Sequence, residues 1–315
     1  MLKNLSWLLA AVLLTAFSVV PVYAEEADIT PEEYYRIMSE QKINQSYDPP
    51  SPEDIEWNKK FDIAAEKVHQ AYQQYYADEI DFDELLRVEQ EFDRKLDPED
   101  VPRRERTAEE IQAKRENLEA YKKSLGENPE KSPAALSAYG DGEDVYLPMP
   151  YEYQSTPYNC GPATAVNIVN GYGHTSITQS YAAAQLGTTV NGTNFGNNWK
   201  NILNYSTMRK GYSLAYGSSY SNWVMKLAEK SIRTMMGGRG VALDTYMSTG
   251  TDYLPGYSGG NVWHYVAAYG FDSTNPSARW IRYIDPNGYN PSAAGAKKVP
   301  YQLMGRVTKP LGIVY

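Results

Sequence analysis

The chain has 315 residues, of which 42% are hydrophobic, so it is long enough for two domains of about 150 residues each. Its net charge of −9 is unevenly distributed: residues 25–132 hold 30 acidic and 16 basic side chains, whereas residues 133–315 hold 9 acidic and 13 basic ones. No dense run of basic residues occurs, which argues against nucleic acid as a partner. The single cysteine, Cys160, excludes an internal disulfide.

The first 24 residues have the three parts of a secretory signal peptide. Lys3 gives a positive start, residues 7–20 are apolar, and Val22-Tyr23-Ala24 is a small-residue cleavage site. The apolar run is shorter than the roughly 20 residues that a membrane-spanning helix needs. We therefore expect a mature chain that begins near Glu25, is exported to the cell surface or beyond, and has no membrane span. An uncleaved anchor is the alternative.

Residues 25–126 are predicted to form an acidic, all-helical region. Thr30-Pro31-Glu32-Glu33 and Thr107-Ala108-Glu109-Glu110 have the capping-box pattern that opens helices. Between them, apolar residues recur at three- and four-residue steps over residues 51–76, and Asp81 is placed to cap a further helix. A removable pro-region is one hypothesis for this segment, and a spacer or partner-binding bundle is the other.

Residues 127–144 are rich in Pro, Gly, Ser and Ala, which predicts a linker before a second domain at 145–315. Helices are expected from Cys160 to Gly171, from Ser176 to Leu186, and near 199–205, 221–236 and 301–307. Strands are expected near 212–216, 240–246, 262–269, 280–284 and 311–315. Helices first and antiparallel strands last predict an α+β domain.

Cys160 is a candidate nucleophile because it stands at the expected start of a helix. The N-terminus of a helix carries roughly half a positive charge, which favours the reactive thiolate over the thiol. Pro162 is tolerated in the first turn because its missing N–H would be unpaired there. Gln154, six residues earlier, can turn its side-chain amide toward the sulfur and donate to an oxyanion formed on an attacked carbonyl. A simple loop glutamine is the alternative for Gln154.

His264 is the best candidate for the base that Cys160 needs. Of the three histidines, His69 lies on a helix without metal-ligand neighbours. His174 follows the end of the cysteine helix, and a rise of about 1.5 Å per residue carries it far from the sulfur. His264 lies in a predicted strand and is followed by apolar residues and Gly270. A packed strand histidine is its alternative role.

Asp285 is the predicted partner of His264. If Gly270 pairs with Arg279 across a hairpin, then His264 directly faces Asp285 and the two share one face of the sheet. A carboxylate there can orient the imidazole and stabilise its cation. A turn aspartate before Pro286 is the alternative role for Asp285, and Asp272 and Asn287 are fallback partners for His264.

Gln154 and Asn159-Cys160-Gly161-Pro162-Ala163 resemble the nucleophile motif of papain-like cysteine peptidases, above all the bacteriocin-processing (double-glycine) family thirty-nine and its relatives. The histidine strand and the Asp285-Pro286 step also resemble that family. The resemblance covers about residues 145–315 and implies a two-lobed fold, with a helical lobe carrying the cysteine and a sheet carrying the histidine and aspartate. The bacteriocin-processing members are domains of membrane transporters, so their double-glycine specificity is not expected in an exported chain.

These observations predict a secreted cysteine peptidase that cleaves peptide or protein substrates through Cys160, His264, Asp285 and Gln154, without metal or cofactor. Two alternatives remain open. One is a cell-surface binding module with this fold but no turnover, and the other is an acyl transferase that uses the same triad. The acidic helical region is expected to dock on the positively charged second domain.

Overall fold

The computed structural model describes residues 56, 63, 67–68, 70–96, 108–126, 142–171, 177–207, 211–249, 252–275 and 278–315. The expected signal peptide, the capping box at Thr30, most of the expected linker, His69 and His174 lie outside these residues. No helix in the described part is both long and apolar enough to cross a membrane.

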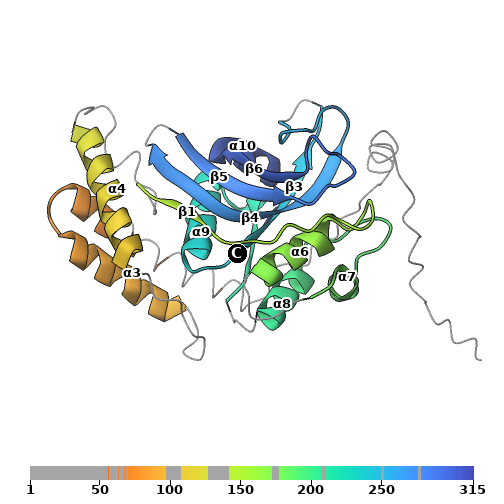
Figure 1. Cartoon of the computed structure of the whole chain (residues 1–315), viewed down its shortest axis with the longest axis horizontal. Coiled ribbons are helices and arrows are strands. Elements are labelled where there is room, and N and C mark those ends of the chain that lie inside the picture. The colour runs from red at the N-terminus through yellow and green to blue at the C-terminus, as the bar shows by residue number, and fades with distance from the viewer. Residues whose placement is uncertain are drawn as a thin grey trace, which may run out of the picture.

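An antiparallel sheet forms the centre of the molecule (Figure 1). Its strands follow the order β2-β7-β3-β4-β5-β6, with β1 paired to β4. The strands are β1 Asp144–Tyr146, β2 Leu214–Tyr216, β3 Val241–Met247, β4 Val262–Asn275, β5 Ala278–Asp285, β6 Gly295–Pro300 and β7 Gly312–Val314. Because β4 is central and longest, residues on it contact elements from every part of the domain.

Helices cover both faces of this sheet. They are α3 Phe82–Leu96, α4 Ala108–Gly126, α6 Cys160–Gly171, α7 Gln179–Leu186, α8 Asn197–Ser206, α9 Trp223–Met236 and α10 Tyr301–Thr308, with a short 3-10 turn at Gly217–Ser219. The side chains of a strand alternate between the two faces of a sheet, and the core follows that alternation. Ala242 and Ala267 pack with α6, α7 and α8, whereas Leu243 and Val266 pack with α9 and α10.

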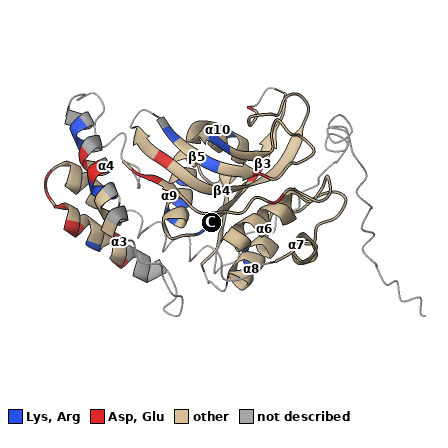
Figure 2. Cartoon of the chain, viewed as in Figure 1, with Lys and Arg blue, Asp and Glu red and all other residues tan. Residues whose placement is uncertain are grey.

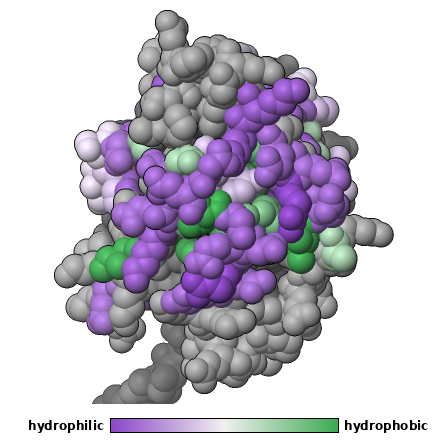
Figure 3. Space-filling view, turned by 90° about the vertical axis from the view of Figure 1, so that its left-hand side faces the viewer, coloured by the Kyte–Doolittle hydropathy of each residue, from purple (hydrophilic) through white to green (hydrophobic). Residues whose placement is uncertain are grey.

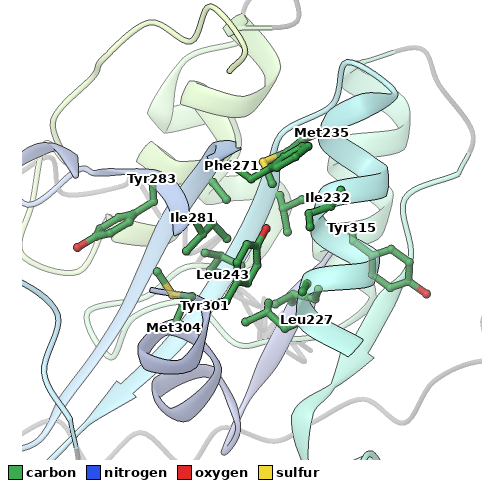
Figure 4. Packing of buried hydrophobic residues seen from close by; sticks show 14 of the residues in the cluster. Leu227, Ile232, Met235, Leu243, Phe271, Ile281, Tyr283, Tyr301, Met304 and Tyr315 are labelled. Carbon is green, nitrogen blue, oxygen red and sulfur yellow. The ribbon is translucent and has the colours of Figure 1, made fainter. Parts of the chain in front are cut away.

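The core on the α9 and α10 side is the larger of the two (Figure 4). Leu227 and Ile232 of α9 meet Leu243 of β3 and Ile281 of β5 there, and none of these four side chains is exposed. Tyr301 of α10 packs beside them. Burial of each such side chain contributes about 1.5–3 kcal/mol, so this core fixes the sheet on which the candidate site is built.

The helical region is joined to this same core. Tyr72, Phe82, Leu85 and Leu118 are buried in it, together with residues of α9 and the sheet. Figure 1 places α3 and α4 at the opposite end of the molecule from α6, and Figure 3 shows that their outward side is mostly hydrophilic. The helices therefore bury an apolar face against the domain and present a polar face to solvent.

A buried ion pair strengthens the same junction. Lys114 of α4 is bonded to Glu143, just before β1, and to Glu89 of α3 at 3.1 Å. Tyr72 accepts from the same ammonium at 2.8 Å, and Arg233 of α9 donates to the backbone oxygen of Glu89 at 3.4 Å. Removing one partner of a buried pair leaves an uncompensated charge, so these residues tie the helical region firmly to the domain.

Most predicted elements of the second domain are present, but some of their limits differ and one strand was not predicted. Thr178 caps α7, because its side chain accepts from the N–H of Tyr181, whereas the helix was expected to begin at Ser176. Strand β4 runs on to Asn275, well beyond the expected end near Gly270. Strand β6 was not predicted, because its Ala, Lys and Pro residues do not alternate in hydrophobicity.

Candidate active site

Cys160 is the first residue of α6, and residues 160–169 of this helix are all buried. The side chain of Cys160 is only 5% exposed and belongs to the core between the sheet and α6, α7 and α8. Figure 2 shows that these three helices carry almost no charged side chains. The first N–H groups of a helix have no intrahelical partner and together carry partial positive charge, so the sulfur lies where an anion is favoured.

A close approach holds the start of α6 against the loop at residues 188–193. A Cβ atom added to Gly161 would lie 2.4 Å from the hydroxyl oxygen of Thr193, so only glycine fits beside that side chain. The Thr193 hydroxyl is in turn 2.8 Å from that of Thr188. This contact explains in physical terms why glycine follows the cysteine.

His264 lies on β4 and is completely buried. Its Nε2 atom is 2.8 Å from Oδ1 of Asp285, at the end of β5. Its backbone oxygen accepts from the Thr245 hydroxyl at 2.7 Å, which fixes β4 against β3 at this residue. Because Nε2 is bonded to Asp285, Nδ1 is the ring nitrogen that can exchange a proton with Cys160.

Two further groups hold the carboxylate of Asp285. Its Oδ1 atom accepts from the Tyr257 hydroxyl at 3.2 Å and from the backbone N–H of Asn287 at 2.9 Å. The side-chain amide of Asn287 donates to the Tyr257 hydroxyl at 3.1 Å. The ring of Tyr257 also lies 5.6 Å from that of His264. Asn287 was a fallback partner for the imidazole, but its contacts act through Tyr257 and Asp285.

The predicted hairpin register is wrong, although the contact that it predicted is present. Gly270 pairs with Arg282, not with Arg279, because β4 continues past Gly270 and has irregular pairing on both sides of residues 270–272. Ala267 pairs with Ile284, so continuing the ladder places Asp285 opposite Val266. The shift from the predicted register is two residues, which keeps both side chains on one face. His264 and Asp285 are therefore diagonal neighbours, within reach at a spacing of about 7–8 Å between Cα atoms.

The surroundings of His264 favour its charged form. Burial alone lowers the pKa of this imidazole, but the charge and hydrogen bond of Asp285, together with the interaction with Cys160, outweigh burial. The net effect raises the pKa of His264 from 6.5 to about 10. The ring is then an imidazolium at neutral pH, and its Nδ1 makes no hydrogen bond of ordinary geometry among the described residues.

Gln154 lies on the loop before α6 and makes contacts that differ from the predicted ones. Its side-chain nitrogen donates to the backbone oxygens of Thr156 at 3.0 Å and Pro157 at 3.1 Å, so both amide hydrogens brace the loop rather than point to an oxyanion. Its backbone N–H donates to the Pro286 oxygen at 2.8 Å. Gln154 thus connects the cysteine loop to the segment that carries Asp285.

Asp272 lies outside the site. It pairs with Lys298 at 2.7 Å, eight residues along β4 from His264, which is about 26 Å at roughly 3.3 Å per residue. In the described ranges, no cluster of three or more His, Cys, Asp or Glu side chains could hold a metal ion.

Sequence reasoning missed Asp244, a second buried aspartate, whose carboxyl interacts electrostatically with Cys160. It lies on β3, directly across from Tyr265 of β4, and is fully buried. Burial holds the pKa of this carboxyl well above its usual range, and the interaction with Cys160 adds to that effect. The available signal was an aspartate at a core-facing position of an otherwise apolar strand.

The comparison with protein families finds one family. Residues 146–308, more than half of the chain, match the model of the Peptidase_C39 like family. The match includes Cys160, His264 and Asp285. A comparison with curated proteins gives no significant match. The family match shows that this chain belongs to the Peptidase_C39-like family, a family of cysteine peptidase type.

Proposed function

We propose that the protein is a secreted cysteine peptidase that hydrolyses amide bonds with Cys160 as nucleophile, His264 as acid and base, and Asp285 as the residue that orients His264. The observation that carries the proposal is the 2.8 Å contact between His264 Nε2 and Asp285 Oδ1, which leaves Nδ1 to serve Cys160. The elevated pKa of His264 and the position of the sulfur at a helix N-terminus support the same assignment.

The proposed reaction has two halves. The thiolate of Cys160 attacks the amide carbonyl carbon, and the carbonyl oxygen becomes an oxyanion that the backbone N–H of Cys160 stabilises. The C–N bond then breaks as Nδ1 of His264 gives its proton to the leaving amine, and a thioester remains on Cys160. In the second half, water attacks the thioester while Nδ1 takes a proton from it, the C–S bond breaks, and the carboxylic acid leaves.

Gln154 is proposed as a second oxyanion donor, but the hydrogen bonds that its side chain already makes limit this role. Its two amide hydrogens bond to Thr156 and Pro157, so one of these bonds must open before the amide can donate to substrate. The same rearrangement would loosen the loop that precedes Cys160. Gln154 therefore contributes less to catalysis in this proposal than a donor that is already free.

A two-lobed, papain-like arrangement is the finer proposal for the fold. In it, α6, α7 and α8 form the lobe that carries the cysteine, and the sheet forms the lobe that carries His264 and Asp285. The existence of separate cores on the two faces of the sheet supports this arrangement. The exported location is proposed from residues 1–24, and N-terminal sequencing of the exported chain should begin near Glu25.

We favour a fixed structural role for the helical region over that of an inhibitory pro-region. The described helices share a core and a buried ion pair with the domain, and they lie at the opposite end from α6. Cutting a protease site inserted between residues 127 and 141 of the folded protein should therefore leave activity unchanged. A large increase in activity after the cut would instead support inhibition by this region.

The proposed function is tested by replacing Cys160 with alanine. The exported protein is compared with this variant on a peptide library, and a thiol alkylator is applied to both. Because Cys160 is the sole cysteine, the variant should lose all cleavage and all labelling. Cleavage that survives in the variant would overturn the mechanism. Labelling without any cleavage in the wild type would favour the binding module, and new amides in the presence of added amines would favour the acyl transferase.

A further inference from the structure

Asp244 is a buried acid that the proposed mechanism does not use. None of its surface is exposed, and neither carboxylate oxygen has a hydrogen bond of ordinary geometry within the described part of the chain. A buried charge without a partner is costly, and a buried carboxyl group avoids that cost by keeping its proton. An isolated aspartate in the core therefore needs a physical explanation.

The neighbours of Asp244 belong to the buried core that also contains Cys160. Tyr265 lies across the ladder from Asp244, and its hydroxyl approaches the carboxyl without forming a hydrogen bond of ordinary geometry. The ring of Trp199 on α8 lies 4.7 Å from that of Tyr265, and its buried Nε1 also has no hydrogen bond among the described residues. Trp199 and Tyr265 belong to the same core as Cys160.

The charged groups around Asp244 explain which form it takes. The groups that interact with its carboxyl are Tyr265 and His264 on β4 and Cys160 on α6. On the other side, β7 offers only the backbone of Gly312 at the paired position. His264 favours the charged carboxylate and Cys160 disfavours it, while burial is the largest effect and favours the neutral acid. In the described chain no lysine or arginine pairs with Asp244.

Side chains alternate along β3, and the neighbours of residue 244 point to the α9 side, so Asp244 points to the other face. Asp244 and Asp285 therefore lie on opposite faces of the sheet, on either side of the Cys160–His264 pair. We propose that Asp244 is a positioning residue for Cys160: it keeps its proton in the buried cluster with Tyr265, so that the thiolate meets a neutral polar group on this side and a cation on the other. This inference rests on the proposed nucleophilic role of Cys160.

A neutral Asp244 has a clear advantage for the nucleophile. Two like charges close together in a buried site disfavour each other, so an ionised Asp244 would push Cys160 toward the unreactive thiol. The effect is reciprocal, because the charge of Cys160 also changes the pKa of Asp244. When the sulfur forms a neutral thioester, its charge no longer raises the pKa of Asp244, and the carboxyl releases its proton more readily.

Infrared spectroscopy of the folded full-length protein tests this proposal without any substrate. The C=O stretch of a protonated carboxyl group is recorded against pH, and the spectrum of Asp244→Asn is subtracted. We expect a protonated-carboxyl band at neutral pH that disappears as pH rises. Its absence at neutral pH would overturn the proposal. Asp272→Asn is the matched control and should leave the band in place, because Lys298 holds the pKa of Asp272 below its usual range against the effect of burial.

Two variants should shift, in opposite directions, the pH at which half of this band is lost, which is called the midpoint below. Cys160→Ala removes the charge that disfavours the carboxylate, so the midpoint should fall. Tyr265→Phe removes a hydroxyl that favours the carboxylate, so the midpoint should rise. An unchanged midpoint in Cys160→Ala would contradict the link to Cys160, and an unchanged midpoint in Tyr265→Phe would contradict the effect of the Tyr265 hydroxyl on Asp244.

Turnover provides a separate readout. Asp244→Asn keeps a neutral polar group and should retain more activity than Asp244→Leu, which should lose up to about a hundredfold in kcat because the nucleophile is misplaced. Equal losses in the two variants would contradict the positioning role. If Asp244→Asn does not fold, the band is assigned in wild-type protein that carries a carbon-isotope label in its aspartate carboxyl groups. Alkylation of Cys160 in the wild type then takes the place of the Cys160→Ala variant. The infrared result stands even if no peptide is cleaved, so it separates this proposal from the proposed function.

Discussion

The two sides of the Cys160–His264 pair hold their buried aspartates in very different ways. On the β5 side, Asp285 is bonded to His264, to the Tyr257 hydroxyl and to the backbone N–H of Asn287. On the β3 side, Asp244 is equally buried but makes no hydrogen bond of ordinary geometry in the described chain. The comparison teaches that burial alone does not decide the charge of a carboxyl group. Its donors and its nearest cation decide that charge, and hence its role.

Replacing Asp285, the aspartate on the β5 side, should have the largest effect on activity. Asp285→Ala leaves the imidazole without its orienting partner and leaves the cation unpaired in the core, so kcat/KM should fall on the order of a thousandfold or more. Asp285→Asn should lose less, because its amide oxygen can still accept from Nε2. Steady-state kinetics on one cleaved peptide measure both, and equal rates for Asp285→Ala and the wild type would remove Asp285 from the mechanism.

Gln154→Ala should have the next largest effect. The variant loses a proposed oxyanion donor and a brace on the loop before Cys160, so kcat should fall by about a hundredfold, at the lower end for such donors. The control is Asn159→Ala, which removes the bond to the Ser155 hydroxyl at 2.9 Å and so loosens the same loop without removing a donor to the oxyanion. A similar loss in both variants would assign Gln154 to loop support alone.

The pH dependence of stability should separate the charge of His264 from its packing. Its pKa is about 10 in the folded protein and 6.5 as the ordinary value, so folding favours the protonated ring. The stabilisation is fully present below pH 6.5 and is lost as pH rises toward about 10. Urea unfolding should show a stability that declines through this window in the wild type, by up to about 1.4 kcal/mol per pH unit from this group. The decline should be smaller in His264→Gln, and identical slopes would contradict a paired imidazolium.

Tyr257→Phe should have the smallest effect. The variant removes one donor to Asp285 and leaves the Asn287 amide without its acceptor, but the direct bond from His264 remains. We expect a loss of about 1–3 kcal/mol in the free energy of unfolding and only a few-fold loss in kcat. Chemical unfolding and kinetics on the same sample measure both. A kcat loss as large as that of Asp285→Ala would give Tyr257 a catalytic rather than a supporting role.

The sequence indicated which residues to propose as the candidate site, but it predicted their contacts less well. Cys160 and His264 could be found because a lone cysteine and a lone strand histidine are rare, and each has few alternative roles. The register between β4 and β5 could not be predicted, because the irregular pairing near Gly270 depends on tertiary contacts. The contact with Asp285 was still predicted, because a two-residue shift preserves the face of the sheet.

The remaining features depend on packing that a sequence pattern does not reveal. Asp244 could not be assigned, because its neighbours Tyr265, Trp199 and Cys160 come from three separate elements. The amide of Gln154 was expected at the oxyanion, but loop carbonyls two and three residues later compete for it. Helices α3 and α4 lie within the region that was predicted to be helical, whereas their junction to the domain through Lys114 and Glu143 depends on the folded arrangement.

The central claim is that Cys160 reacts as a thiolate paired with the His264 imidazolium. The most direct measurement is the rate of Cys160 alkylation against pH in the wild type and in His264→Ala, because the chain has no other thiol. The claim predicts fast alkylation at neutral pH in the wild type and a much slower reaction at that pH in the variant, which lacks the cation that favours the thiolate. Superimposable pH profiles for the two proteins would contradict the claim.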